Sequence, residues 1–216
     1  MKDCVSIIAP YVTDIINTSI TTWCFQSAGK HAIITPLIKK YGLDDSAQSN
    51  NRPLSNFPFL SKILEPVINR HTIVYLDERN HLSEVQSASR RGHSTETSQL
   101  RIFSDLIKAM DTESLSRLSL LDLSDAFDTV AHDIQQMRLK KSFSISRRSF
   151  QWFVSYLTDR TQSVFIAADC MLPRTLKTGV PQGSVLGPLL FTIYTAGISK
   201  VIRAHVLLHH SYAWQR

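Results

Sequence analysis

The central part of the chain carries two carboxylates directly after a short apolar stretch. Leu118–Leu121 is apolar with polar flanks, which predicts a buried strand, and this strand ends on Asp122, with Asp128 six residues further on. A carboxylate at the end of a buried strand costs free energy unless something pairs with it. A divalent cation is a suitable partner, because hard cations bind carboxylate oxygens. The alternative is that Asp122 caps the following turn or helix, and this stretch alone favours the cap because such caps are common.

A loop rich in glycine and proline is the second feature whose residue types suggest chemistry. The sequence GVPQGSVLGPLLF (179–191) joins a strand-like stretch to a helical one. Gly183 lets the backbone approach a ligand closely, Ser184 is suited to cap the helix, and Pro188 falls in the first turns, where a missing N–H costs least. The alternative is an ordinary loop before a helix, since loops of this composition are frequent.

In this order, the two stretches resemble motifs A and B of the reverse transcriptase domain of non-LTR retrotransposons of the jockey type. The stretch around Asp122 is similar to motif A, and PQGSVLGPLLF (181–191) is similar to motif B. Further blocks are similar to the family's N-terminal fingers segment, its RPIS…KILE block, its QSGFR…HSTETA block and its SYLTDRTQ segment; they span residues 30–40, 51–65, 86–97 and 155–162. So many blocks in family order make the resemblance specific.

The resemblance implies an α+β fold, the fingers and part of the palm of a right-hand polymerase without its thumb. The expected division is a fingers-like region over 1–110 and an incomplete palm over 111–216. The implied activity is RNA-directed DNA polymerisation, with an RNA template, an RNA–DNA hybrid and deoxynucleoside triphosphates as partners. Such enzymes use two-metal catalysis, so the resemblance also implies Mg²⁺ or Mn²⁺ as cofactor.

The family's motifs assign roles to particular residues of this chain. Asp122 matches the motif A carboxylate that binds the catalytic metal, and Phe127 matches the aromatic residue that lies beneath the nucleotide sugar and excludes ribose. That exclusion is steric, because only a 2′-hydroxyl distinguishes the two sugars. Gln182 and Gly183 of the motif B stretch are the corresponding nucleotide-binding residues of the loop.

Two cations in the first third of the chain are candidates for contact with a triphosphate. Lys39 and Arg52 bracket a polar loop, and the resemblance implies that both contact the incoming nucleotide. Arg would bind phosphate through a forked contact and Lys as a point charge. The alternative is ordinary surface charge, which is the usual state of an isolated cation.

The end of the sequence departs from the family. Where motif C has Tyr-Ala-Asp-Asp, this chain reads YAWQR (212–216), and neither Trp214 nor Gln215 can replace an anionic ligand of a hard cation. The change after Ala213 is interpreted as a frameshift or a splice. Because both motif C aspartates are missing, we expect no polymerisation. Asp125 and Asp128 lie close to Asp122 in the sequence, but Asp128 comes after the strand and is not a metal ligand in the family.

Two alternatives to an enzyme stay open at this stage. One is a catalytically inactive module that binds nucleic acid, and the other is a relic that folds poorly.

His205 and His209 have the i, i+4 spacing of a zinc pair on a helix, but the stretch is predicted as a strand, where the pair is too far apart to chelate easily.

Composition narrows the class of protein. The chain has 216 residues, of which 43% are hydrophobic and 19% charged, which is typical of a globular protein. No apolar run reaches the length of a membrane span, there is no signal-peptide pattern, and three widely spaced cysteines fit a reducing compartment, so an intracellular location is expected. The net charge of +6 and pI of about 9.3 permit binding to a polyanion.

Hydrophobic periodicity and turn residues predict the elements that position these groups. Ser94 and Thr97 form a predicted capping pair at a helix start. Helices are predicted over 5–22, 57–76, 95–110, about 131–143, 150–157 and 184–198, and strands over 32–38, 118–121, 162–168, 172–179 and 201–210.

Overall fold

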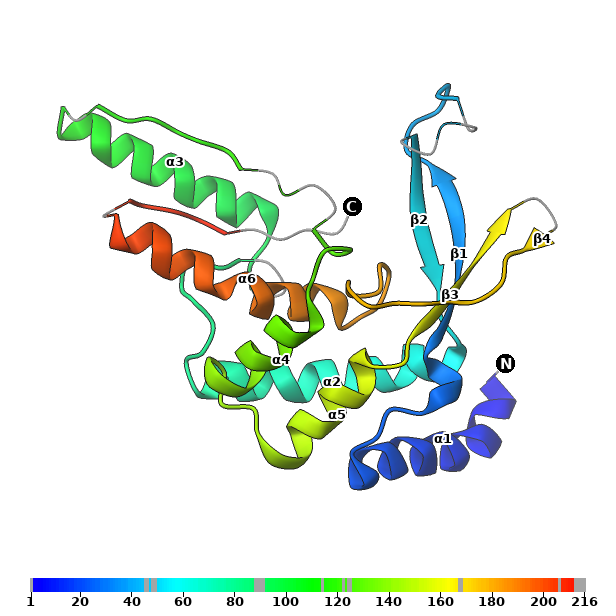
Figure 1. Ribbon diagram of the computed structural model, residues 1–216. Helices are drawn as coiled ribbons and strands as arrows, with labels where there is room; N and C mark the ends of the chain where they lie inside the picture. Colours follow the sequence, from blue (N-terminus) through cyan, green and yellow to red (C-terminus); the bar gives the residue numbers. More distant parts are fainter. Residues whose placement is uncertain are drawn as a thin grey trace.

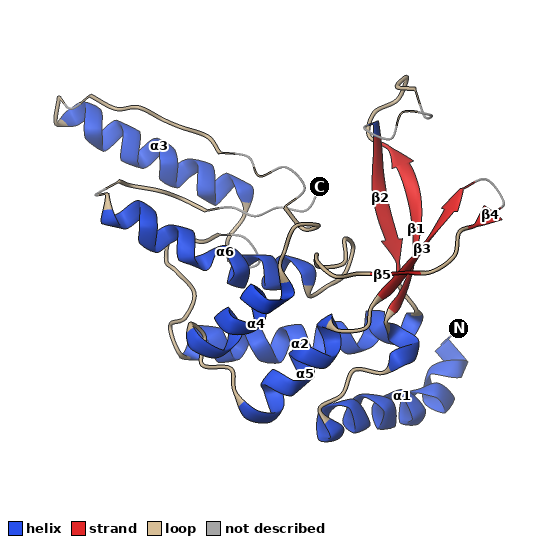
Figure 2. Cartoon of the chain, in the orientation of Figure 1, coloured by secondary structure: helices blue, strands red, loops and turns tan. Residues whose placement is uncertain are grey.

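The computed structural model of the chain describes residues 2–44, 47, 50–87, 92–113, 115–121, 123, 126–166, 169–205 and 207–211. It has six long helices and five strands in this part of the chain (Figures 1 and 2). The helices are α1 (Lys2–Thr22), α2 (Phe59–Glu78), α3 (Thr95–Asp111), α4 (His132–Lys141), α5 (Arg147–Leu157) and α6 (Gly187–Ala204), with a short 3₁₀ turn at Ser27–Gly29. The strands are β1 (His31–Ile38), β2 (Asn51–Asn56), β3 (Thr161–Ile166), β4 (Asp169–Cys170) and β5 (Arg174–Thr175).

The strands form one sheet in the order β2-β1-β3-β4, with β5 paired to β3. β1 and β2 form an antiparallel hairpin in which Ile34 faces Ser55 and Leu37 faces Arg52. β1 also pairs in parallel with β3, so that His31 lies beside Thr161. The helices lie to one side of this sheet, as Figure 2 shows, and the mixed content agrees with the predicted α+β class.

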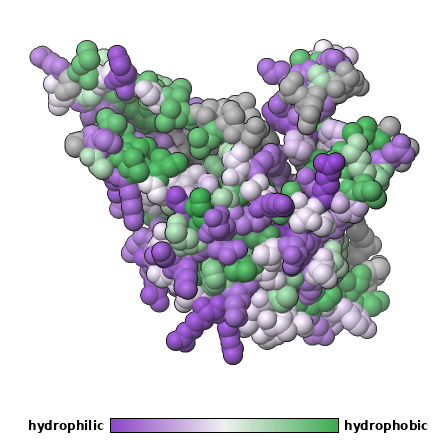
Figure 3. Space-filling view, in the orientation of Figure 1, coloured by the Kyte–Doolittle hydropathy of each residue, from purple (hydrophilic) through white to green (hydrophobic). Residues whose placement is uncertain are grey.

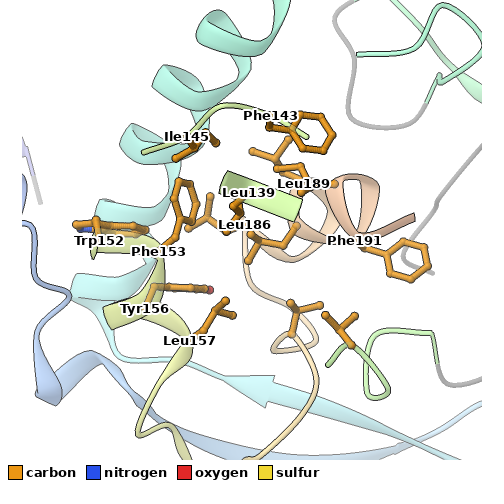
Figure 4. Packing of buried hydrophobic residues seen from close by; sticks show 14 of the residues in the cluster. Leu139, Phe143, Ile145, Trp152, Phe153, Tyr156, Leu157, Leu186, Leu189 and Phe191 are labelled. Carbon is orange, nitrogen blue, oxygen red and sulfur yellow. The ribbon is translucent and has the colours of Figure 1, made fainter. Parts of the chain in front are cut away.

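The hydrophobic core lies among the helices rather than under the sheet. α5 contributes Trp152, Phe153, Tyr156 and Leu157, which pack with residues of α4 and with the start of α6 (Figure 4). All three aromatic rings of α5 are buried, as the helical spacing of apolar residues in 150–157 suggests. Full burial of such side chains contributes about 2 kcal/mol each, so the packing of α5 against α6 stabilises the helical part of the fold.

The N-terminus of α3 has the predicted capping pair. The backbone N–H of Thr97 donates to Ser94 Oγ at 3.2 Å, and the backbone N–H of Ser94 donates to Thr97 Oγ1 at 2.8 Å. α3 lies apart from the core beside α6 in Figure 1, and its apolar stripe is largely exposed. The cap therefore carries much of the stability of this helix, because tertiary packing contributes little.

Two predicted strands are absent from the described residues, and both predictions are wrong. Leu118, Leu120 and Leu121 are 55%, 83% and 86% exposed in an irregular segment, because no described strand lies beside it to pair with its backbone. The prediction over 201–210 fails because α6 continues to Ala204: Ile198, Val201 and Ile202 extend its three- and four-residue spacing. Beyond it, 207–210 are irregular.

The prediction of two strands over 162–168 and 172–179 is only partly correct. β3 forms as expected, but its partner is split into β4 and β5, two strands of two residues each. The helix predicted over 184–198 begins later, at Gly187, with Pro188 in its first turn as expected.

In the described residues, no helix combines the length and the apolarity that a bilayer crossing requires.

Replacing Ser94 by Ala should loosen the first turn of α3, because an N-cap side chain contributes about 1 kcal/mol. We expect the protection of the first-turn amides against hydrogen exchange to fall about fivefold. Ser104→Ala, at an exposed position inside the same helix, is the control and should not lower it. Equal exchange in the two variants would contradict the capping role.

Candidate functional site

A small pocket lies where the loop after β5 crosses the β1–β2 hairpin. Its volume is about 210 Å³. The lining residues come from five segments: Ala32 and Ile34 of β1, Pro53 and Ser55 of β2, Asp128, Gln162 of β3, and the loop residues Leu176 and 178–182. Residues that lie more than a hundred positions apart in the sequence therefore share one cavity, and the proline-glycine loop forms one of its walls.

Backbone hydrogen bonds join this loop to the turn that follows the motif A stretch. The N–H of Gly179 donates to Val130 O at 2.8 Å, and the N–H of Val180 donates to Phe127 O at 2.7 Å. Gly179 has a φ of +91°, and a Cβ there would lie 3.0 Å from Asp128 O. Only glycine fits this position without strain, so the close approach of the two motifs depends on it.

A side-chain hydrogen bond links the same two motifs. Gln182 Nε2 donates to Asp128 Oδ2 at 2.9 Å. Since the amide nitrogen is held by a carboxylate, the amide oxygen of Gln182 is turned away from Asp128. The sequence did not predict this role for Asp128, because the partner of a surface carboxylate cannot be read from spacing alone.

Phe127 lies against the core beside the pocket. Its ring stacks on that of Phe191 in α6, with centroids 4.9 Å apart and an interplanar angle of 28°. The side chain is half-buried and packs against the core cluster. The structure therefore fixes the ring next to Asp128, which lines the pocket.

Gly183 brings the loop against the edge of β2. Its φ is +86°, and a Cβ there would lie 3.2 Å from Ser55 O. Any other residue at this position would be strained by its backbone conformation and crowded by the strand. The backbone at Gly183 therefore lies close to strand β2 of the same chain, at Ser55.

Glu65 of α2 holds the end of the loop from beneath, and the sequence did not predict this role. Its side chain is 1% exposed. Oε2 accepts the backbone N–H groups of Val185 and Leu186 at 2.7 and 3.3 Å, and Oε1 accepts the hydroxyl of Tyr156 at 3.2 Å. Burial raises the pKa of Glu65, while the two backbone hydrogen bonds act in the opposite direction.

Arg160 is a second charge buried in this region. It is 1% exposed, and its guanidinium lies over the rings of Tyr156, Phe57 and Phe25 at 4.6, 5.4 and 5.7 Å from their centroids. Its Nη1 donates to Tyr156 O at 3.1 Å. Burial, followed by the charge of Glu65, raises the pKa of Tyr156, so its hydroxyl stays protonated and donates to Glu65.

The two predicted cations lie outside the pocket lining. Arg52 is exposed on β2, where it pairs with Leu37 of β1. Because side chains alternate along a strand, Arg52 lies on the opposite face of the sheet from Pro53, which lines the pocket. Lys39 follows β1 and is also exposed, and its backbone N–H donates to Asn50 O at 2.8 Å. The structure therefore brings Phe127, Gln182 and Gly183 together and leaves Lys39 and Arg52 farther out on the hairpin.

Asp122 and residues 212–216 lie outside the described residues. Over the part of the chain that is described, no group of three His, Cys, Asp or Glu side chains could hold a metal ion. His205 follows the last turn of α6 and His209 lies in the irregular segment beyond it, so the two do not share a helix. His210 instead shares a hydrogen bond of 2.8 Å with Ser87 Oγ.

Comparison with protein families and curated proteins gives a consistent picture. The family described as reverse transcriptase (RNA-dependent DNA polymerase) matches residues 38–213. A probable RNA-directed DNA polymerase from transposon BS of Drosophila melanogaster is 33% identical over 188 residues, which is 87% of this chain and 20% of that protein.

Two further relatives from the same organism are a probable RNA-directed DNA polymerase from transposon X-element, 30% identical, and an RNA-directed DNA polymerase from mobile element jockey, 29% identical. They cover 86% and 84% of this chain. The chain spans about a fifth of the length of these curated relatives.

Replacing Glu65 by Ala should destabilise the fold by about 3 kcal/mol, because it leaves the N–H groups of Val185 and Leu186 and the hydroxyl of Tyr156 without their acceptor. Glu65→Gln should cost about 1 kcal/mol, since an amide oxygen can still accept the backbone N–H groups. Glu78→Ala on the exposed face of α2 is the control, expected to change stability little. Urea unfolding gives all three values, and an Ala variant as stable as the control would refute the role of Glu65.

The stability of the native chain relative to Glu65→Gln should also depend on pH. Because the folded-state pKa of Glu65 is raised above 4.5, the folded state binds the extra proton more tightly than the unfolded state. The contribution of Glu65 is therefore fully present below pH 4.5 and is lost as pH rises through the folded pKa. Urea unfolding at a series of pH values should show that the free energy of unfolding of the native chain falls relative to that of the Gln variant as pH rises over this range. A difference in free energy that does not change with pH would contradict the raised pKa.

Proposed function

Because the chain belongs to the reverse transcriptase (RNA-dependent DNA polymerase) family, we propose that it acts as the fingers and partial palm of a retrotransposon RNA-directed DNA polymerase. Residues 1–110 are the fingers-like region and 111–216 the palm, as the sequence suggests. RNA template, RNA–DNA hybrid and deoxynucleoside triphosphates are the proposed partners. Its proposed location is inside the cell.

One observation supports the nucleotide site more than any other: the loop with Gln182 and Gly183 closes a pocket against the β1–β2 hairpin and the Phe127–Asp128 turn. In this proposal Phe127 supports the sugar and crowds a 2′-hydroxyl, and the free side of the Gln182 amide contacts the nucleotide. Lys39 and Arg52 remain the proposed contacts of the triphosphate, which they would reach from the outer part of the β1–β2 hairpin.

The donor set does not fit the metal ions that the family implies. Two Mg²⁺ or Mn²⁺ ions need several carboxylates, and the described carboxylate at the pocket, Asp128, accepts a hydrogen bond from Gln182. At the two positions that correspond to the motif C aspartates, the sequence has Trp214 and Gln215. We therefore propose that the chain binds nucleic acid and nucleotide without joining them, and we derive no catalytic step through a metal.

Primer extension on an RNA template with Mg²⁺ or Mn²⁺ tests this proposal. We expect no product from the native chain or from Asp122→Ala. A double variant, Trp214→Asp with Gln215→Asp, should gain activity if the missing carboxylates are the only defect. Extension by the native chain that Asp122→Ala abolishes would overturn the proposed inactivity.

Binding should be detectable without catalysis. An RNA–DNA hybrid labelled with a fluorophore should bind the native chain in the presence of EDTA, with an affinity that falls steeply as salt rises. Gly183→Ala should weaken nucleotide binding at the loop, whereas Gly42→Ala, also at positive φ but with nothing within 4 Å of its Cβ, is the matched control. No salt-dependent binding at all would favour the poorly folding relic.

A further inference from the structure

Helix α3 carries an apolar stripe that stays open to water in the described part of the chain. The stripe consists of Leu100, Phe103, Ile107 and Met110, which are 68%, 60%, 57% and 72% exposed. Figure 3 shows hydrophobic side chains along this helix. Residues 95–111 are all described, and among them only Ser98 is buried. Because helices are stabilised mainly by packing of their apolar face, we expect the stripe to have a partner.

The exposed apolar surface of this region is larger than a monomer normally carries. At about 180 Å² for a fully exposed residue of this size, the exposed fractions correspond to about 460 Å² on the stripe. The segment directly after α3 adds four exposed leucines: Leu115, Leu118, Leu120 and Leu121. They raise the total to about 1,000 Å², whereas the largest apolar patch of a typical monomer is about 300–600 Å². A stable dimer buries about 800 Å² on each partner, so this surface is large enough for an interface.

The spacing of the stripe is the same when it is read in either direction. The intervals between its residues are three, four and three positions, as between the a and d positions of two heptads. When a second copy of α3 lies antiparallel across the first, Leu100 therefore meets Met110 of the partner, and Phe103 meets Ile107 of the partner. A two-fold axis midway along the stripe relates the equivalent contacts. The stripe is thus complementary to itself.

The positions beside the centre of the stripe carry no charge. By helical spacing, Gln99 and Leu106 lie along one side of it and Ser104 along the other. Depletion of charged residues is typical of the centre of a protein–protein interface. The whole helix has three acidic and two basic residues, so it lacks the excess of Lys and Arg with which surface helices bind anionic membranes.

We propose that α3 is a dimerisation helix, through which two copies of this chain associate about a two-fold axis with their stripes packed antiparallel. Burial of apolar surface from both copies stabilises the pair, and the leucines of 115–121 extend the contact. The proposal requires neither nucleotide nor nucleic acid and is independent of the function proposed above. No residue of α3 lines the pocket at the proline-glycine loop, so dimerisation and nucleotide binding can be tested separately.

Sedimentation velocity of the full chain over a range of concentrations tests the association. We expect the native chain to change from monomer to dimer as its concentration rises. Ile107→Glu should raise the dissociation constant of the dimer at least tenfold, because each dimer would then bury two unpaired carboxylates. Ile7→Glu is the matched control and should dimerise like the native chain, since Ile7 is also an exposed isoleucine in a helix, 67% exposed in α1.

Two results of this experiment overturn the proposal. One is a native chain that stays monomeric throughout the range, and the other is an Ile107→Glu chain that dimerises like its control. A monomeric chain that binds phosphatidylcholine vesicles, and loses this binding in Ile107→Glu, would assign the surface to lipid instead. Circular dichroism and urea unfolding establish that each variant is folded.

Disulfide cross-linking tests the antiparallel arrangement without adding a charge. Leu100→Cys and Met110→Cys are introduced separately into a chain whose three native cysteines are replaced by serine, and one variant carries a size tag. After mixing and mild oxidation, the two variants should form disulfides with each other in preference to their own kind, because only unlike positions meet in the antiparallel pair. A preference for disulfides between identical chains, or none between the two variants, would contradict this arrangement.

Discussion

The arrangement of the molecule depends on a carboxylate that is removed from water. Glu65 lies inside the helical core and accepts both backbone N–H groups at the point where the proline-glycine loop turns into α6. These N–H groups would otherwise be buried without a partner at a helix start. Tyr156 and Arg160 complete the surroundings of the carboxylate, so α2, α5 and α6 meet at one polar centre within an apolar core.

This centre determines where the loop can go. From its fixed end at Leu186, the loop returns past β2 at Gly183 and reaches the Phe127–Asp128 turn at Gly179. Both glycines have positive φ and are crowded by backbone oxygens, so the path has little freedom. The position of Gln182 is thus a consequence of a buried interaction on the other side of the loop.

Much of the helical framework could be predicted from the sequence, because a period of three to four residues reports a buried face directly. That holds for α2 and α5, and Ser94 marks the start of α3. Glu65 follows Leu64 in α2 and is buried with it, but the hydrophobic pattern did not predict a carboxylate in the core. Its partners were unpredictable, since they lie 91 to 121 residues away. The strand predicted over Leu118–Leu121 was wrong for a related reason, because an apolar stretch forms a strand only where another strand pairs with it.

The parallel pairing of β1 with β3 also governs how the chain can acquire its structure during synthesis. His31 and Thr161 are 130 residues apart, so β1 must wait for most of the polypeptide before one of its edges is covered. Until then the nascent chain presents an open strand edge, a surface on which molecules aggregate. Cutting the gene after residue 110 would yield a first half with that edge permanently exposed. Strands from the first and the last third of the chain thus share one sheet, and a ribosome that stalls before β3 would release a product prone to aggregation.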